Sequence, residues 1–328
     1  MNIYITYFTD KGKNVCESLE WEFQEEKTFI RNGEKIKDWT KTAFENADAI
    51  IFIGAAGIAV RSCAPFLKGK DKDPAVIVCD ELEKYVIPIL SGHIGGANAF
   101  ALQIARYLGA EPVITTATDL NGVWAVDNWA VEKGLYIFDP HNIKFVSGAL
   151  LRGQKVGLVC DIPFDLSGLP EDVILNDTSL DVGVDITPFS RPSKFKHSLK
   201  LVPRCIALGV GCKKNTEDFD MIKAFSHLRI HKEAVKCIAT IDLKKDEHAV
   251  HSLCALTGAK LICYTAAELA KAKGEFSASD FVKKITGVDN VCERAAKLAS
   301  NGGEMYVKKT VYNGITMAAC GIVDRSDR

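Results

Sequence analysis

The sequence predicts an α/β protein with an N-terminal, mainly parallel α/β domain, a small middle lobe and a separate C-terminal α/β domain. In the first part of the chain, continuously apolar runs alternate with amphipathic stretches, as expected when helices cover both faces of a parallel sheet. Glycine, proline and aspartate then become frequent, and a second strand and helix alternation begins at Lys200. These observations predict three ranges, residues 1–131, 132–200 and 201–323.

Local patterns predict the elements of the first two parts. Apolar runs and amphipathic spacing indicate strands and helices, and a cluster of prolines, serines and alternating basic residues is typical of a linker. The N-terminal strands are expected at 2–8, 49–53, 75–79, 86–90 and 112–115, with helices at 14–23, 38–45 and 99–108. The middle lobe is expected to contain a helix at 142–151, strands at 155–160, 173–176 and 182–186, and an inter-domain linker at 188–198.

The same patterns recur in the C-terminal domain, which ends in a hairpin. The dipeptide Asn313-Gly314 is a strong signal for the two-residue turn of such a hairpin. Strands are expected at 205–210, 235–241, 260–264, 305–311 and 315–320, and helices at 217–228, 249–257, 266–271, 279–285 and 291–299.

Composition excludes several classes of protein. The chain is 47% hydrophobic and 25% charged, as soluble globular proteins are. Neither an apolar run near twenty residues nor a basic leader is present, so we expect a cytoplasmic protein without a membrane span. The eleven cysteines form no CxxC pair, which argues against disulfide or zinc frameworks.

Charge is unevenly spread along the chain. Residues 194–328 contain 23 lysines and arginines against 15 acidic residues, about +8, and since the formal net charge is −1, about −9 remains for residues 1–193. This asymmetry suggests an anionic ligand handled mainly by the C-terminal half. A solvated, lysine-rich surface is the competing interpretation. Nothing in the pattern points to nucleic acid.

Two polar loops follow the predicted strands at 86–90 and 112–115. Since carboxyl ends of neighbouring parallel strands meet at one edge of a sheet, we expect SGHIGGAN and TTATD to lie together there. Glycines lack a β-carbon, so an anionic group could approach backbone N–H groups at the following helix N-terminus. The expected ligand carries carboxylate or phosphate. The candidate binding residues are Ser91, Gly92, Gly95, Gly96, Asn98, Thr115, Thr116 and Thr118.

His93 and Asp119 are the candidate catalytic residues of these loops. Imidazole titrates near working pH, so His93 could act as acid or base, or it could only orient a substrate. Asp119 could orient His93, act as a base, or cap a helix. Asp127 in AVDNWA is interpreted either as a site residue or as a structural hydrogen-bond partner.

The C-terminal domain carries a second set of candidates. Lys244 and Glu247 lie three residues apart after a strand, so they could pair on one face of a helix. A lysine held in this way could bind a carboxylate or polarise a carbonyl. The alternative is a surface ion pair, which contributes little to stability. Cys212 could be a nucleophile, although a buried structural thiol is the favoured interpretation. The candidate binding residues are Gly209, Gly211, Cys212, Lys213, Lys214, Glu293 and Lys309, of which Glu293 could also be a second acid or base.

Several of these segments resemble one known family. SGHIGGAN, ITTATD and AVDNWA resemble the N-terminal part of the cobalt-precorrin-5A hydrolases of anaerobic cobalamin biosynthesis. GVGCKKNT, TIDLKKDE and VKKTVYNGITMAA resemble their C-terminal domain, in order and spacing. The family pattern places its lysine and glutamate at Lys244 and Glu247. Asn215 departs from the small residue, often glycine, that is usual there.

The resemblance implies a substrate and a reaction. The substrate would be cobalt-precorrin-5A, a cobalt-containing tetrapyrrole with acetate and propionate arms, one closed as a δ-lactone onto a methylated meso carbon. The enzyme would open that lactone and release the carbon as acetaldehyde, leaving cobalt-precorrin-5B. Cobalt would arrive inside the macrocycle, so no cofactor is expected. The first hypothesis places the macrocycle between the N-terminal loops, which do the chemistry, and the C-terminal lysines, which hold carboxylates.

Two other functions remain open at this point. One is a non-catalytic tetrapyrrole carrier that passes intermediates between pathway enzymes, and transient contacts with such enzymes are also possible for a hydrolase. The other is a sugar- or nucleotide-phosphate enzyme, which is the weaker hypothesis because the GxGxxG fingerprint is absent. The histidine pairs 227/231 and 248/251 lack the acidic third ligand or HExxH context of a known metal site, so the protein itself is not expected to bind a metal.

Overall fold

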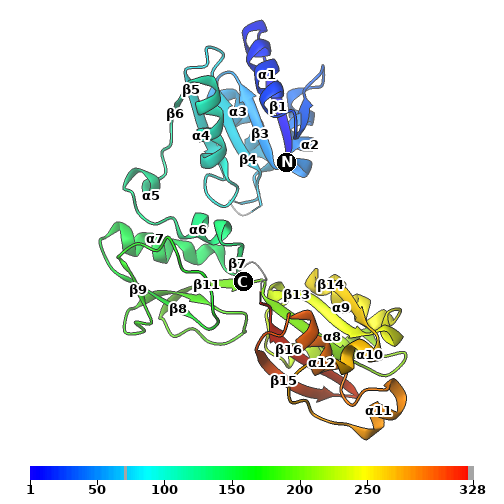
Figure 1. Cartoon of the computed structure of the whole chain (residues 1–328). Helices are drawn as coiled ribbons and strands as arrows, with labels where there is room; N and C mark the ends of the chain where they lie inside the picture. Colours follow the sequence, from blue (N-terminus) through cyan, green and yellow to red (C-terminus); the bar gives the residue numbers. More distant parts are fainter. Residues whose placement is uncertain (70–71, 324–328) are drawn as a thin grey trace. The chain divides into compact units, whose positions relative to one another are not determined.

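The computed structural model describes residues 1–69 and 72–323 and contains three mixed α/β sheets (Figure 1), which confirms the predicted fold class. Contacts within the chain divide it into two compact units. Unit 1 comprises Met1–Glu132, Ile143–Lys155 and Gly168–Asp172, and unit 2 comprises Lys133–Asn142, Val156–Ser167 and the chain from Val173 onward. The division cuts across the range 132–200, and the three domain ranges stay a prediction.

Unit 1 contains a six-stranded sheet in the order β2-β1-β3-β4-β5-β6. All neighbours are parallel except β4 and β5, so the sheet is mainly parallel as expected. The strands are β1 (Asn2–Tyr7), β2 (Lys27–Ile30), β3 (Ala49–Ile53), β4 (Ala75–Cys79), β5 (Tyr85–Leu90) and β6 (Glu111–Pro112).

Helices cover both faces of this sheet. Side chains of α1 and α4 share one apolar cluster with alternate residues of β1, β3 and β4. Side chains of α2 and α3 share a second apolar cluster with the residues of β1, β3 and β4 that face the opposite side of the sheet. Every residue of β3 and β4 is therefore buried, which explains their continuous apolar runs. The helices of unit 1 are α1 (Asp10–Glu22), α2 (Ile36–Asn46), α3 (Ala56–Cys63), α4 (Ala97–Leu108), α5 (Ala117–Leu120), α6 (Val126–Glu132) and α7 (Ile143–Leu151).

Two strand predictions in unit 1 were wrong in detail. The strand expected at 112–115 shrinks to β6, of which only Pro112 belongs to the predicted range, since proline supplies no N–H to a ladder. Strand β2 was missed because its KTFI sequence is half exposed and short. The β5–α4–β6 unit nevertheless forms with β5 parallel to β6, so the two polar loops follow neighbouring strands at one edge.

Unit 2 begins with a five-stranded sheet in the order β7-β11-β10-β8-β9, antiparallel only between β7 and β11. The linker expected at 188–198 is wrong, because its last residues begin β11 and Phe195 is buried beside Gly157 and Gly183. A Ser193 to Asp185 hydrogen bond holds the same segment. The strands are β7 (Leu135–Ile137), β8 (Val156–Cys160), β9 (Val173–Leu175), β10 (Val182–Ile186) and β11 (His197–Pro203).

The second sheet of unit 2 has the order β14-β13-β12-β16-β15. Helices α8 and α9 pack on one face, and α10 and α12 on the other. Positive φ angles at Asn313 and Gly314 confirm the predicted hairpin turn. The elements are β12 (Ile206–Gly211), α8 (Asp218–Ser226), β13 (Val235–Ile241), α9 (His248–Thr257), β14 (Lys260–Tyr264), α10 (Ala266–Ala270), α11 (Asp280–Thr286), α12 (Cys292–Ala299), β15 (Met305–Tyr312) and β16 (Ile315–Gly321).

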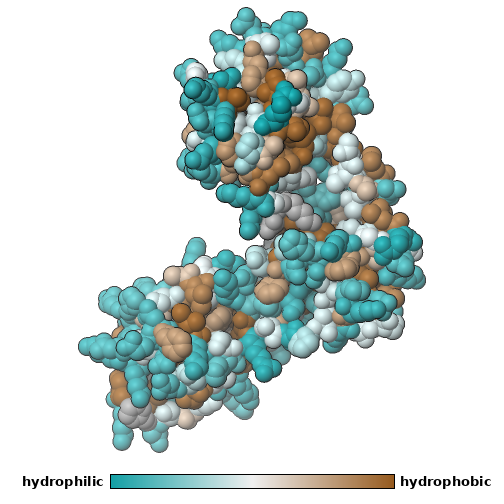
Figure 2. Space-filling view, turned by 180° about the vertical axis from the view of Figure 1, so that it is seen from behind, coloured by the Kyte–Doolittle hydropathy of each residue, from teal (hydrophilic) through white to brown (hydrophobic). Residues whose placement is uncertain are grey.

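Large apolar side chains are not confined to the cores. The face drawn in Figure 2 is mostly hydrophilic, with apolar residues in separate patches. Within the described residues no helix is long and apolar enough to cross a membrane.

Gly209 fixes how closely α12 approaches the second sheet of unit 2. It lies inside β12, where a β-carbon would come 1.7 Å from the carbonyl oxygen of Cys292. Gly209 was expected to contact a ligand, but the structure places it beneath α12. Its physical role there is close packing of helix on strand.

We expect Gly209→Ala to destabilise unit 2 by about 3 kcal/mol, because backbone atoms on both sides must separate. Thermal unfolding measures the loss. Gly148→Ala is the matched control: it lies in α7, its β-carbon would meet only the end of the Arg152 side chain, and helix propensity favours alanine by up to about 1 kcal/mol. Equal stability of Gly209→Ala and the unmodified protein would contradict the packing argument.

Candidate active site

The loop after β5 turns back on itself before α4 begins. The N–H groups of Gly96, Ala97 and Asn98 donate to carbonyls within the loop, at distances of 2.8–3.1 Å. A β-carbon on Gly95 would meet the Ser91 side chain at 2.3 Å, so this glycine permits the tight turn. These N–H groups are therefore used inside the loop and are not presented to an anion, contrary to the expected cradle.

The turn places His93 between two carboxylates. Its Nδ1 lies 3.1 Å from Oδ2 of Asp127, and its Nε2 lies 2.9 Å from Oδ2 of Asp119. Thr118 Oγ1 lies 3.4 Å from the same Nε2. His93 lies in the loop after β5, Thr118 and Asp119 lie on α5, and Asp127 lies on α6. The expected proximity of His93 and Asp119 is thus confirmed.

Asn98 orders the second loop. Its Nδ2 donates to Thr116 Oγ1 at 2.7 Å and to Asp119 Oδ2 at 2.9 Å. Asn98 is itself buried at the start of α4. This contact assigns Asn98 a positioning role for Asp119.

Electrostatics make His93 a cation at neutral pH. The hydrogen bond that its Nδ1–H donates to Asp127 raises the pKa of His93 to about 9, against the opposing effect of burial and with further support from Asp119. Burial acts to raise the pKa of Asp119, but hydrogen bonds from His93, Thr116 and Asn98 prevail and lower it. Both ring nitrogens therefore carry protons, and His93 is equipped to donate a proton and not to accept one.

A small cavity of about 340 Å³ opens beside this group. It is lined by Ser91, Gly92, His93, Thr116 and Thr118 among the predicted residues. Lys144 and Ser147, one turn apart on α7, also line it and were missed, because no sequence signal links α7 to these loops. Asp127, which the sequence left open between a site residue and a structural hydrogen-bond partner, contacts His93 and also lines this cavity.

Unit 2 contains a larger cavity of about 1290 Å³. Lys244 and Glu247 line it and pair as expected, with Nζ 3.2 Å from Oε2. The other oxygen of Glu247 accepts the Thr216 N–H at 3.0 Å, so the glutamate also fixes the loop after β12. Both side chains are shielded, at 16% and 9% exposure, which rules out a simple surface ion pair. Gly211, Cys212, Lys213, Lys214 and Lys309 also line the cavity.

Cys212 remains a thiol in this setting. Burial raises its pKa, and the nearby Lys244 charge only partly opposes that effect. A protonated thiol is a poor nucleophile. The structure thus agrees with the structural interpretation of this cysteine.

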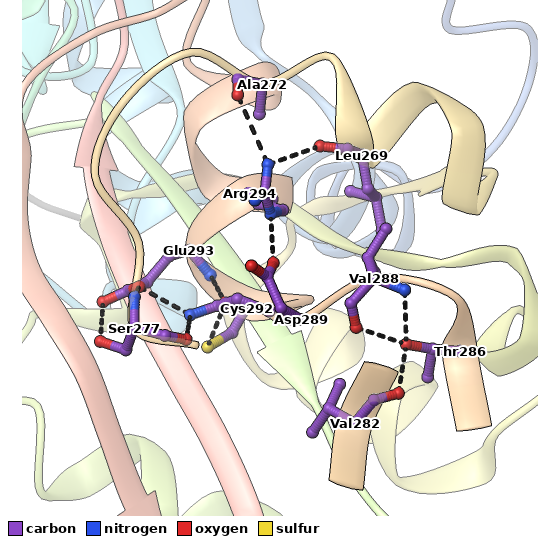
Figure 3. A network of polar contacts seen from close by, with 11 residues as sticks. Leu269, Ala272, Ser277, Val282, Thr286, Val288, Asp289, Cys292, Glu293 and Arg294 are labelled. Carbon is purple, nitrogen blue, oxygen red and sulfur yellow. Dashed lines mark hydrogen bonds and ion pairs between the residues drawn. The ribbon is translucent and has the colours of Figure 1, made fainter. Parts of the chain in front are cut away.

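Glu293 lies behind this cavity in a network of polar contacts (Figure 3). Its Oε1 accepts the Lys309 N–H at 2.8 Å, and its Oε2 accepts the Ser277 N–H at 2.8 Å and Asn290 Nδ2 at 2.6 Å. The residue is only 2% exposed. Glu293 therefore connects β15 to the segment before α11 and does not face the cavity, which contradicts its expected role in binding.

The histidine pairs 227/231 and 248/251 lie outside the site around His93. His231 is buried and burial lowers its pKa, while His248 contacts Asp218 at 2.8 Å. Among the residues that the structure describes, no three histidine, cysteine, aspartate or glutamate side chains form a group suited to a metal ion.

The charged state of His93 leads to a pH-dependent stability. Because folding raises its pKa from 6.5 to about 9, its contribution is complete below about pH 6.5 and is lost as the pH rises through about 9. We expect Asp127→Asn to lower this pKa, as measured by NMR titration of the ring. The control Asp10→Asn changes an exposed carboxylate in unit 1 and should leave the pKa of His93 unchanged. An unaltered pKa in Asp127→Asn would contradict the assignment.

We expect Glu293→Ala to cost roughly 3 kcal/mol of stability, because it leaves three N–H donors without their acceptor. Hydrogen exchange should accelerate at the amides of Ser277 and Lys309. Glu275→Ala, on the same segment but exposed, should change stability by less than about 0.5 kcal/mol. Unchanged exchange at both amides would show that the network does not order these segments.

Comparisons with known proteins identify the family. Residues 38–119 match Cobalamin synthesis G N-terminal, residues 124–203 match Cobalamin biosynthesis central region, and residues 206–320 match Cobalamin synthesis G C-terminus. A Salmonella typhimurium protein named cobalt-precorrin-5A hydrolase is 35% identical over 278 residues, covering 80% of this chain and 79% of that protein. A Priestia megaterium protein of the same name is 29% identical over 264 residues, covering 74% and 70%.

A crystal structure of a cobalamin biosynthesis protein G homolog from Sulfolobus solfataricus is also similar, at 21% identity and a TM-score of 0.41, covering 98% of this chain and 97% of that one. The family matches and the 35% identity confirm the resemblance noted in the sequence. The chain belongs to the cobalamin synthesis G family and is an enzyme of cobalamin biosynthesis.

Proposed function

We propose that this chain opens the δ-lactone of cobalt-precorrin-5A with water and releases the methylated meso carbon as acetaldehyde, giving cobalt-precorrin-5B. The observation that supports this most is the His93 imidazolium held between Asp119 and Asp127 beside a small cavity. Relatives at 35% and 29% identity carry the name cobalt-precorrin-5A hydrolase. A non-catalytic carrier would have no use for such a proton-transfer group.

Exposure separates the roles of the two carboxylates. The Asp127 side chain is 6% exposed and keeps its contact with Nδ1, whereas the Asp119 side chain is 33% exposed and has more freedom to leave Nε2. When the lactone enters, its ring oxygen takes the place of Asp119 at Nε2. Asp119 is then free to accept a proton from the attacking water.

The first step is hydrolysis of the ester bond. Water attacks the lactone carbonyl and transfers a proton to Asp119, and the bond between the carbonyl carbon and the ring oxygen breaks. The Nε2 proton of His93 passes to that oxygen, which leaves as a hydroxyl group on the meso carbon. Thr116 and Thr118 hydroxyls line the same cavity and can donate to the oxyanion that forms on the carbonyl.

The second step breaks a carbon–carbon bond. The hydroxyl group loses its proton, its oxygen forms the carbonyl of acetaldehyde, and the electron pair of the broken bond stays on the macrocycle, which takes up a proton.

In unit 2, Lys244 is held by Glu247, and Lys213, Lys214 and Lys309 line the same cavity, where they bind carboxylate arms. No cofactor of the protein's own is needed, because cobalt arrives within the substrate, and we place the reaction in the cytoplasm.

We expect His93→Ala and Asp119→Asn to lower acetaldehyde release at least a hundredfold, because proton transfer typically contributes that much or more. Purified variants are incubated anaerobically with cobalt-precorrin-5A, acetaldehyde is trapped, and the macrocycle is analysed by mass. Asn121→Ala, on the same loop but exposed, is the control. Wild-type turnover in both variants would refute the assignment of these residues. Binding of an unchanged lactone by the unmodified protein would favour the carrier.

A further inference from the structure

Four large apolar side chains in the lining of the unit 2 cavity are exposed to solvent. Phe219, Leu243, Ile285 and Val311 line the cavity, and we call them the apolar rim. They come from four separate elements, namely α8, the short 3-10 helix Asp242–Lys244, α11 and β15. The folded chain leaves them 72%, 66%, 62% and 67% exposed. Four large, exposed apolar side chains that line one cavity from different elements are typical of a binding surface.

Among the residues that line the cavity, unpaired lysines outnumber unpaired carboxylates by three to two. Lys213, Lys214 and Lys309 line the cavity and have no ion-pair partner within 4.0 Å in the described part of the chain. Of the acidic side chains there, Glu247 is paired with Lys244 and Asp218 with His248, while Glu217 and Asp246 have no cationic partner within 4.0 Å among the residues that the structure describes. The three free ammonium groups are suited to separate carboxylates on one ligand.

Size limits the ligand further. The cavity of about 1290 Å³ exceeds the roughly 300–1,000 Å³ of drug-sized ligand sites. The unit 1 cavity, at about 340 Å³, could accept one arm of a large molecule but not its whole body. A large ligand with an apolar face and several carboxylates therefore fits the unit 2 cavity.

We infer that the unit 2 cavity is the docking site for the macrocycle, with the ring face against the apolar rim and peripheral carboxylates on Lys213, Lys214 and Lys309. This inference rests on the proposed function, since it takes its ligand from there. It adds that affinity for the macrocycle resides in the rim of unit 2 and is separable from proton transfer by His93.

Binding without turnover tests this separation. His93→Ala is titrated anaerobically with cobalt-precorrin-5A, whose visible absorption reports binding. Adding Phe219→Ala or Leu243→Ala should raise the Kd about tenfold each, as expected for loss of a large anchoring side chain. Both residues are exposed, so folding should survive, which thermal unfolding checks. Trp21→Ala removes an equally exposed aromatic residue from unit 1 and should leave the Kd unchanged.

A competitor that has carboxylates but no ring tests how much of the affinity comes from the ring. Butane-1,2,3,4-tetracarboxylate, which has carboxylates but no ring, should compete at least a hundredfold less well than the macrocycle. An unchanged Kd in both rim variants, or equal competition by the tetracarboxylate, would overturn the inference while leaving lactone hydrolysis intact. If instead the unmodified protein binds the macrocycle through the rim but releases no acetaldehyde, the proposed function fails and the docking site stands.

Discussion

The candidate active site depends on one interaction, the contact of both ring nitrogens of His93 with carboxylates from separate helices. Asp127 on α6 holds Nδ1, and Asp119 on α5 faces Nε2. Without a tight turn before α4 the imidazole would not reach either partner, and the close approach of Gly95 to Ser91 makes that turn possible. The glycines therefore shape a loop around a charged histidine, and the loop N–H groups are used to hold that shape.

In unit 2, shielded carboxylates likewise fix the segments around a cavity. Glu247 fixes the loop after β12 while it holds Lys244, and Glu293 connects β15 to the segment before α11. In each case a shielded carboxylate accepts backbone N–H groups that would otherwise lack a partner. Glu247 thus orders the lining of the cavity from within and Glu293 from outside it, while Lys213, Lys214 and Lys309 keep their ammonium groups out of these contacts.

The sequence predicted what local patterns determine. The apolar runs of β3 and β4 and the turn at Asn313 follow directly from burial and backbone conformation, and the pairing of His93 with Asp119 followed from the parallel β5–α4–β6 unit. It could not show that Asp127 reaches His93, since thirty-four positions separate them. It could not show that Glu293 points away from the cavity, and a proline-rich stretch concealed β11 because its pairing partners lie elsewhere in the chain.

The central claim is that His93 acts as the proton donor, in a charged state maintained by Asp127. The pH dependence of acetaldehyde release from cobalt-precorrin-5A, compared between the unmodified enzyme and Asp127→Asn, tests it most directly. The account predicts a rate that falls as the pH rises through about 9 in the unmodified enzyme, and at clearly lower pH in the variant. An alkaline limb at the same pH in both proteins would contradict it.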